Sequence, residues 1–287
     1  MKPSSSPSPP LPPAPSAPGV PPTHESIAAD LRSLGLEAGR TVLVHASLRS
    51  LGWVCGGALA VVQALLDVLG PEGTLVVPTF TSDNRDPSRW KDPVVPEEWW
   101  PTIRERLPAF DPALTPGHRM GAISEQVRSW PRALRSTHPH TSFAALGPLA
   151  SEIVSGHELT CHLGERSPLA RLEDADALVL LLGVGWERCT CFHLAEYRQP
   201  SPPVRQYEGA VLGPRGREWV TFEDVDLDDS DFARLGAAFE ASAPVATGTV
   251  GAAASKLFAI RLAVTFADVA LRSRFRAECS HRFVTTV

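Results

Sequence analysis

The hydrophobic positions of this 287-residue chain form short apolar runs that alternate with segments of helical periodicity. Short apolar and β-branched runs are typical of buried strands, whereas apolar residues spaced three and four apart indicate helices. The pattern predicts strands at residues 41–44, 74–78 and 177–184, and helices at residues 26–34, 59–69, 120–128, from 148 onward, 231–240 and 250–271. A strand, a helix and a strand across residues 41–78 suggest a parallel crossover unit, the building block of an α/β sheet.

A second pattern indicates antiparallel pairing as well. Residues 204–211 and 218–222 alternate like two paired strands, with Gly213-Pro214-Arg215-Gly216 as the turn. The predicted fold is therefore α/β, with a central mixed β-sheet flanked by helices. We find no linker within residues 23–287, which predicts a single domain there, while the Pro/Ser/Ala-rich residues 1–22 read as a disordered tail.

The stretch between Thr81 and Pro116 is long and carries Trp90, Trp99 and Trp100. Loops of this length in compact domains are commonly lids or binding loops. The alternative is a peripheral insertion that packs its tryptophans on the core.

Composition narrows the function. The chain is 43% hydrophobic and 21% charged with a net charge of -5, and it has no basic stripe, so nucleic acid is not an expected partner. It has no apolar stretch of membrane-spanning length and no signal-peptide layout, which predicts a cytoplasmic protein without membrane contact.

An odd count of 5 cysteines predicts reduced, structural thiols. No metal is expected, because the Cys189-Thr190-Cys191 spacing is too tight for a zinc half-site and no HExxH motif occurs. No Gly-x-Ser-x-Gly nucleophile elbow occurs either.

The strongest candidate for chemistry lies where the apolar run 177–184 leads into the segment Cys191 to Arg198. A strand followed by a helix would deliver His193 and Glu196 together, because residues three apart on a helix share a face. Histidine suits proton transfer near neutral pH, and a neighbouring carboxylate can orient it or bind an ammonium group. The alternative is a structural histidine on an amphipathic helix.

Further polar clusters follow other predicted strands. Residues 45–50, with Gly52 and two more glycines before a helix, could bind phosphate or form an ordinary strand-to-helix turn. Residues 135–142 place two histidines around a proline, and they could bind a carbonyl or phosphate or form a hydrogen-bonded turn. Residues 164–169 could bind a ligand or simply start a helix. The acidic run 223–231 could attract a polycationic substrate, although such runs are more often solvated faces with a helix cap.

At these clusters the chain resembles the aminoglycoside N(3)-acetyltransferase family, also called the antibiotic N-acetyltransferase family. The resemblance spans residues 24–271. The matching segments are Val44-His45-Ala46-Ser47-Leu48, Gly73-Thr74-Leu75, Pro78-Thr79-Phe80, Met120-Gly121, His138-Pro139, Ser142-Phe143-Ala144-Ala145-Leu146-Gly147, Ser167-Pro168-Leu169, Leu182-Gly183-Val184-Gly185 and His193-Leu194-Ala195-Glu196.

The resemblance implies transfer of an acetyl group from acetyl-coenzyme A to an amine of a cationic antibiotic, on a fold distinct from the common small acetyltransferase fold. It implies that the segment from His193 to Glu196 carries the base and contacts the amine. On chemical grounds we hypothesise that His193 is the general base with Glu196 as its partner, and that Thr79 or a loop N–H stabilises the oxyanion. The expected acceptor contacts are Glu196, Tyr197 and Asp224. The expected coenzyme contacts are His45, Ser47, Leu48, Ser50, His138, Ser142, Phe143 and Ser167.

Two alternatives remain open at this point. The first is an N-acetyltransferase for a different amine, in antibiotic biosynthesis or self-protection. The second is a non-catalytic coenzyme- or nucleotide-binding module with structural histidines. A monomer or a homodimer is expected, and the amino group that receives the acetyl group is taken to be the 3-amino group.

Overall fold

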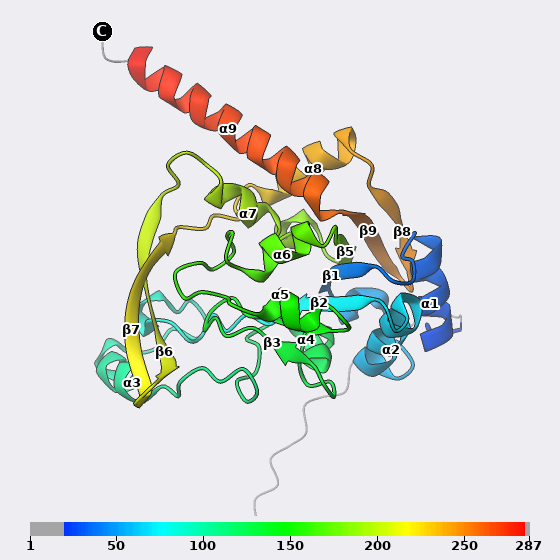
Figure 1. The fold of residues 1–287 in the computed structure, drawn as a ribbon, viewed down its shortest axis with the longest axis horizontal. Helices are drawn as coiled ribbons and strands as arrows, with labels where there is room; N and C mark the ends of the chain where they lie inside the picture. Colours follow the sequence, from blue (N-terminus) through cyan, green and yellow to red (C-terminus); the bar gives the residue numbers. More distant parts are fainter. Residues whose placement is uncertain (1–19, 285–287) are drawn as a thin grey trace, which may run out of the picture.

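A seven-stranded mixed sheet forms the centre of the protein, whose computed structural model describes the backbone of residues 20–284 and the side chains as far as Ser273. Its strand order is β3-β4-β2-β1-β5-β9-β8 (Figure 1). The strands are β1 (Thr41–Ala46), β2 (Thr74–Pro78), β3 (Leu134–Arg135), β4 (Phe143–Leu146), β5 (Leu178–Leu182), β8 (Ala246–Val250) and β9 (Ala253–Ala259).

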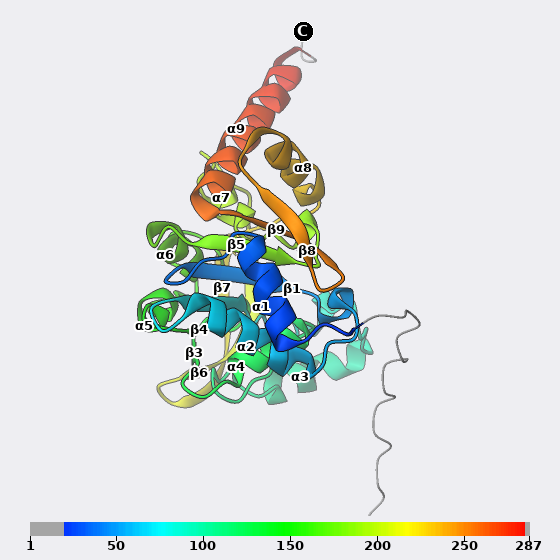
Figure 2. The same ribbon diagram turned by 90° about the vertical axis from the view of Figure 1, so that its right-hand side faces the viewer.

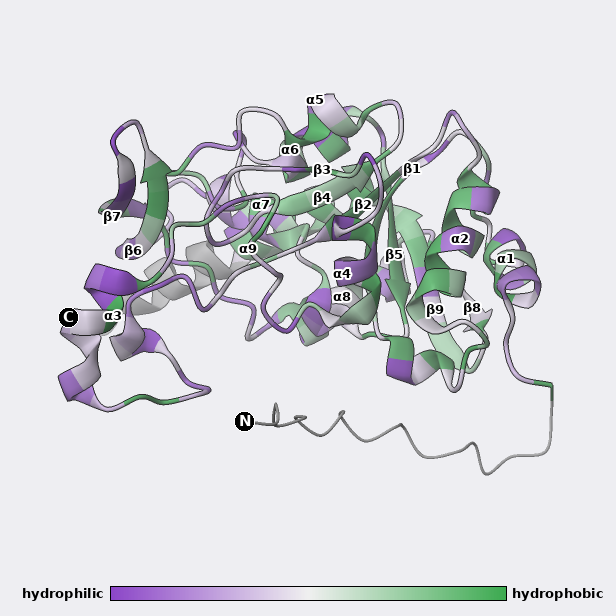
Figure 3. Cartoon of the chain, turned by 90° about the horizontal axis from the view of Figure 1, so that it is seen from below, coloured by the Kyte–Doolittle hydropathy of each residue, from purple (hydrophilic) through white to green (hydrophobic). Residues whose placement is uncertain are grey.

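The pairing of these strands is mixed, as the sequence predicts. Strand β1 is parallel to β2 and β5, which confirms the crossover unit. Strands β4 and β9 are antiparallel to their neighbours β2 and β5, and β3 and β8 extend the sheet at its two edges. The central strands are fully buried, and Figure 3 colours them mainly as hydrophobic.

Helices cover both faces of the sheet because side chains alternate along each strand. Val42 and Val44 of β1 belong to one apolar cluster, and Leu43 between them belongs to the other. The first cluster includes residues of α1 (His24–Ser33), α2 (Gly57–Leu69) and α4 (Gly121–Arg128). The second includes residues of α5 (Ala150–Val154), α6 (Pro168–Asp174), α7 (Phe192–Tyr197), α8 (Phe232–Ser242) and α9 (Ile260–Val284).

A separate two-stranded ribbon lies at one side of the molecule. Strands β6 (Val204–Gly213) and β7 (Gly216–Val225) form the predicted hairpin, which stands beside α3 (Trp100–Arg106) and away from α1 (Figure 1). The Trp-rich stretch packs against this ribbon: the Asn84 amide hydrogen-bonds the carbonyl and the N–H of Ala210. The stretch also contains short 3-10 helices at Pro87–Arg89 and Glu97–Trp99, and Trp99 stays 56% exposed. This arrangement is closer to a peripheral insertion than to a bare loop.

Two local predictions were wrong. Residues 250–271 were read as one helix, but the segment contains the end of β8 and all of β9 before α9 begins at Ile260. Its alanine-rich composition favours a helix locally, whereas pairing of β9 with β5 selects a strand. His45 was placed in a turn, but it lies within β1 opposite Leu181.

The first described helix, α1, packs within the fold, whereas the last, α9, projects from it. Strand β8 lies beside α1, and α9 extends past the rest of the described residues (Figure 2). The predicted disordered tail falls almost wholly on residues 1–19, outside the described part. Within residues 20–284, no helix combines the length and the hydropathy that crossing a bilayer requires.

Candidate active site

His193 and Glu196 meet as the sequence predicts. The Nδ1 atom of His193 lies 2.7 Å from Oε2 of Glu196, one turn along α7. The His193 ring packs against the Phe232 ring, with 4.6 Å between centroids, and Oε1 of Glu196 accepts the Asp228 N–H at 3.2 Å. Among the described residues nothing bonds Nε2 of His193, and its side chain is 11% exposed. One ring nitrogen is thus fixed while the other is available to a ligand, which is the arrangement expected of a general base.

A tight turn delivers these residues to the surface. After the 3-10 helix Trp186–Arg188, the sulfur atoms of Cys189 and Cys191 touch at 3.3 Å, and both side chains are fully buried. The carbonyl of Thr190 then accepts the N–H of His193 at 3.1 Å. The two cysteines anchor the turn in the core, and α7 starts directly after it. They are free thiols, as are Cys55 and Cys161.

A cavity of about 1090 Å³ opens at the ends of β1 and β5, where α/β sheets commonly bind ligands. Its wall includes His45, Ser47, Leu48 and Ser50, four of the predicted coenzyme contacts. The Ser47 hydroxyl accepts the N–H of Ser50 and caps the 3-10 helix Leu48–Leu51. The first polar cluster of the sequence therefore lines a cavity large enough for a sizeable ligand.

Positive charge surrounds this cavity. Four cationic side chains line it against the single carboxylate of Glu187; they are Arg49, Arg119, Arg188 and Lys256. Gly121 and Ala122 also line it, at the N-terminus of α4, where no side chain caps the helix. Free backbone N–H groups at a helix N-terminus favour anions. The cavity is therefore suited to a phosphate-bearing ligand.

His45 connects the cavity to the turn before α7. Burial, with the nearby positive charge of Arg188, lowers the pKa of His45 to about 3, so the ring is neutral at physiological pH. Its Nε2 lies 3.3 Å from the Thr190 hydroxyl. Thr190, in turn, accepts the N–H of His193. The cavity wall and the candidate base are thus joined through one residue.

The remaining predicted coenzyme contacts do not reach the cavity. His138, Ser142, Phe143 and Ser167 are all 0% exposed, and none of them lines it. Ser167 caps α6, and Nδ1 of His138 accepts the N–H of His140 at 3.1 Å. These polar groups fit the alternative readings, a hydrogen-bonded turn and a helix start.

Thr79 is buried in the same way. Its side chain is 1% exposed, its hydroxyl lies within hydrogen-bond distance of the Ser142 carbonyl and accepts the Arg135 guanidinium, and it is absent from the cavity wall. A hydroxyl so engaged has no access to a reacting carbonyl, so the mechanism proposed below assigns it no role.

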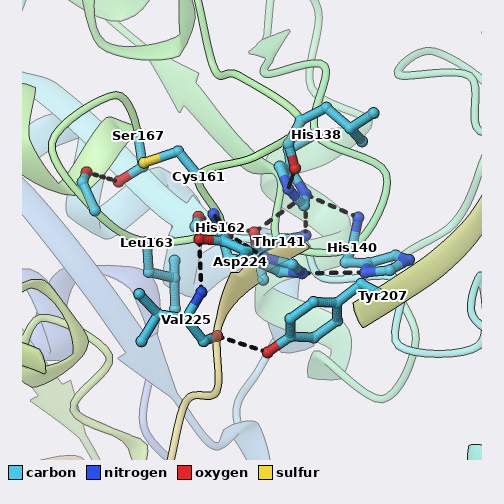
Figure 4. A network of polar contacts seen from close by, with 12 residues as sticks. His138, His140, Thr141, Cys161, His162, Leu163, Ser167, Tyr207, Asp224 and Val225 are labelled. Carbon is cyan, nitrogen blue, oxygen red and sulfur yellow. Dashed lines mark hydrogen bonds and ion pairs between the residues drawn. The ribbon is translucent and has the colours of Figure 1, made fainter. Parts of the chain in front are cut away.

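Four buried histidines form a cluster: His138, His140, His157 and His162. Figure 4 labels three of them, His138, His140 and His162. His162 Nδ1 lies 2.6 Å from the Asp224 carboxylate, and His162 Nε2 lies 3.1 Å from His140 Nδ1. Burial lowers the pKa of each of these histidines. The cluster is a neutral polar core beneath the hairpin rather than part of the cavity.

Asp224 and Tyr197, two predicted acceptor contacts, lie together. They line a smaller cavity of about 360 Å³, which Glu196 does not line. The Tyr197 hydroxyl donates to Asp224 at 2.7 Å. Burial alone would raise the pKa of the Asp224 carboxyl, but hydrogen bonds from His162 and Tyr197 lower it below its ordinary value. The carboxylate is thus already satisfied inside the protein.

Several cavity residues were missed by sequence reasoning. Arg188 and Lys256 carried no motif, and Lys256 lay in a segment read as a helix. Gly183 and Gly185 follow β5 directly, and Ala252 to Ala254 start β9. Glycines after a buried strand were a usable signal, because they let a ligand approach the backbone.

Comparison with known proteins decides the family. The sequence model of the family described as aminoglycoside 3-N-acetyltransferase matches residues 43–272. The chain belongs to this family. The family is one of N-acetyltransferases that use acetyl-coenzyme A, so the predicted enzyme class and acetyl donor are confirmed, and the non-catalytic module is not supported.

Individual members of the family are similar to this chain over most of its length. The SPbeta prophage-derived aminoglycoside N(3')-acetyltransferase-like protein YokD of Bacillus subtilis is 45% identical over 249 residues, which cover 86% of this chain and 92% of YokD. The crystal structure of YokD superposes with a TM-score of 0.86 at 44% identity, covering 88% of this chain and 94% of that one. Aminoglycoside N(3)-acetyltransferase VII of Streptomyces paromomycinus is 38% identical over 262 residues, covering 86% and 90%.

Structures of more distant family members contain ligands. AAC-IIIb, described as a binary complex with CoASH, has a TM-score of 0.79 at 32% identity and covers 88% of this chain and 97% of its own. AAC-VIa, described as bound to sisomicin, has a TM-score of 0.79 at 30% identity and covers 89% and 99%. The predicted α/β fold of the antibiotic N-acetyltransferase type is thereby confirmed.

Proposed function

We propose that this protein transfers the acetyl group of acetyl-coenzyme A to an amino group of an aminoglycoside antibiotic, most specifically the 3-amino group, and so confers resistance. The observation that carries the proposal is the His193 and Glu196 pair at 2.7 Å, joined through Thr190 to His45 in the wall of a cationic cavity. The relatives bound to coenzyme A and to sisomicin support the choice of donor and acceptor.

The mechanism starts with the acceptor amine. An ammonium group has no lone pair, so it must lose a proton before its nitrogen can attack a thioester carbonyl. That first proton leaves to solvent, and the neutral amine then attacks the carbonyl carbon. Nε2 of His193 takes the second proton from the nitrogen as the carbon–nitrogen bond forms. Glu196 keeps the ring in place through Nδ1 and stabilises the imidazolium that results. The tetrahedral intermediate then collapses with loss of the coenzyme thiolate.

The cationic cavity suits acetyl-coenzyme A, the acetyl donor. Coenzyme A carries a pyrophosphate and a 3'-phosphate, and the cavity offers guanidinium groups and the uncapped N-terminus of α4. His45, Ser47, Leu48 and Ser50 keep their proposed role as coenzyme contacts. A thioester at the His45 side of the cavity would lie next to the turn of Thr190 and His193, because His45 contacts Thr190.

Acidic residues support a cationic acceptor. Asp228 is exposed, its backbone N–H contacts Glu196, and its carboxyl pKa is lowered mainly by hydrogen bonds from Ser230, with a smaller effect of His193. A carboxylate that stays ionised beside the base attracts ammonium groups. Of the three expected acceptor contacts, Glu196 is the one this proposal keeps beside the base, because Tyr197 and Asp224 line the smaller cavity.

Arg188→Ala is expected to raise the KM for acetyl-coenzyme A about tenfold in low salt with little change in kcat. The exposed guanidinium would attract the coenzyme phosphates in the ground state and the transition state alike. The effect should shrink in 0.5 M salt because screening weakens such contacts. Steady-state kinetics at two salt concentrations measure it, and Arg215→Ala, at the tip of the hairpin, is the matched control. An unchanged KM would remove Arg188 from the coenzyme site.

The function is tested by incubating the protein with acetyl-coenzyme A and a panel of amines, including aminoglycosides that have or lack a 3-amino group. Mass spectrometry reports the gain of an acetyl group, and NMR of the product assigns the nitrogen. Acetylation restricted to aminoglycosides with a 3-amino group supports the proposal. Acetylation of another amine only would support the biosynthetic or self-protective alternative, and a resistance assay in a susceptible host separates these roles.

A further inference from the structure

Thr190 occupies a position between the coenzyme cavity and the proposed base. Its two neighbours, Cys189 and Cys191, are fully buried, and their sulfur atoms touch at 3.3 Å. The Thr190 side chain is partly exposed instead, and its hydroxyl lies 3.3 Å from Nε2 of His45. The inward-turned cysteines therefore fix the direction of Thr190 toward the cavity wall.

Thr190 is also tied to His193. Its carbonyl accepts the His193 N–H at 3.1 Å, so the two residues belong to one turn of the chain. Residues three apart on such a turn lie on the same side. A thioester whose carbonyl carbon is within reach of an amine held by His193 would place its sulfur on the side of His45 and Thr190.

The Thr190 hydroxyl can act as a hydrogen-bond donor beside His45. His45 is buried at 5% exposure and neutral, so it carries a single ring hydrogen. If that hydrogen is on Nε2, it is donated to the Thr190 oxygen, and the hydroxyl hydrogen is then free for another acceptor next to His45, which lines the cavity although Thr190 does not. A neutral donor in this position can stabilise negative charge on a departing atom.

We propose that the Thr190 hydroxyl, held by His45, donates a hydrogen bond to the thioester sulfur as the carbon–sulfur bond breaks. The inference rests on the acetyl transfer proposed above. The amine nitrogen forms its bond to the carbonyl carbon and gives its proton to His193, and the sulfur departs with the electron pair of the broken bond. The imidazolium proton then neutralises the thiolate, while Thr190 keeps its own proton. Thr190 is on this account a catalytic residue and His45 a positioning residue.

The test compares coenzyme A with desulfo-coenzyme A, which lacks the sulfur atom, in calorimetric titrations of the wild-type protein and of Thr190→Val and Thr190→Ser. Wild type should bind coenzyme A more tightly than the desulfo compound, by a ratio that grows from pH 7 to pH 9 as the thiolate forms. Thr190→Val should lose this ratio while keeping its affinity for desulfo-coenzyme A. Thr190→Ser should keep the ratio because it keeps the hydroxyl.

Turnover provides the second measurement. Thr190→Val should lower kcat by about 10²- to 10³-fold, the order seen when one donor to a developing charge is removed, and Thr190→Ser should recover most of it. Cys191→Ala, which alters the same turn but keeps the hydroxyl, should retain the affinity ratio. Thermal melting confirms that each variant is folded.

The outcomes separate the two proposals. A wild-type protein that binds neither compound would overturn the proposed function and this inference with it. A wild-type protein that binds both compounds equally, or a Thr190→Val variant whose affinity ratio matches that of wild type, would overturn only the role of Thr190. A ratio lost equally in Cys191→Ala would also overturn it, because the turn and not the hydroxyl would then be responsible.

Discussion

His193→Ala is expected to lower kcat for acetyl transfer by about 10²- to 10⁴-fold, the range attributed to a positioned general base. The loss follows from the geometry, because Glu196 fixes Nδ1 and the available nitrogen, Nε2, disappears with the ring. The KM for acetyl-coenzyme A should change little, since His193 does not line the cationic cavity. Steady-state kinetics with a responsive aminoglycoside measure both quantities.

Two further variants make this result specific. Glu196→Gln keeps the size of the side chain but removes its charge, so the imidazolium loses its partner and kcat should fall less than in His193→Ala. His24→Ala is a matched control, because Nε2 of His24 lies 2.7 Å from Asp67 in another histidine–carboxylate pair, on α1. It should leave kcat within about twofold of wild type, the range of a surface substitution.

The pH profile of kcat/KM tests whether His193 is the base. A base must be neutral to accept a proton, so wild-type kcat/KM should fall on the acid side, and His193→Gln should lose this limb of the profile along with most of its activity. If His193→Ala kept normal turnover and the same profile, another group would be the base and the proposed mechanism would be wrong.

The sequence predicted the candidate base because its signal is local. A buried strand followed by a short helix places His193 and Glu196 three residues apart, and neither tertiary contacts nor burial had to be known. The loop after β1 was found for the same reason, since Ser47, Leu48 and Ser50 follow one apolar run.

Other expected contacts are separated from the cavity for a different reason. His138, Ser142 and Ser167 look like ligand contacts in the sequence, yet tertiary packing buries them and satisfies their polar atoms within the protein. Lys256 shows the converse, because it reaches the cavity only once an alanine-rich segment has paired with β5 as a strand. Local propensity cannot reveal the outcome for His138 or Lys256, since both depend on partners more than 20 residues away in the chain.

Acid should unfold this protein steeply, starting below about pH 6.5. Burial lowers the pKa of His45, His140 and His157 to about 3 each, whereas an unfolded histidine titrates near 6.5. Above pH 6.5 these groups are neutral in both states and stability is unaffected. Between pH 6.5 and 3 the unfolded chain binds protons that the folded chain does not. The free energy of unfolding therefore decreases as the pH is lowered through this range.

The size of this effect follows from proton linkage. Each proton taken up on unfolding costs about 1.4 kcal/mol of stability per pH unit, and three such histidines give about 4 kcal/mol per pH unit. Asp224, whose pKa is lowered in the folded state, adds a loss in the same direction below about pH 4. A domain stable by about 5–15 kcal/mol would therefore unfold within a few pH units of neutrality.

Urea unfolding at pH 7.5, 6, 5 and 4, followed by circular dichroism, measures the slope. His157→Gln is the informative variant, because an amide can replace the donor to the Cys161 and His162 carbonyls without binding a proton. This variant should reduce the slope of the free energy of unfolding against pH by the contribution of one proton, whatever its stability at pH 7.5. A flat stability between pH 7.5 and 5 would mean that the buried histidines take up protons in the folded protein over the same pH range as in the unfolded chain, and the prediction would be wrong.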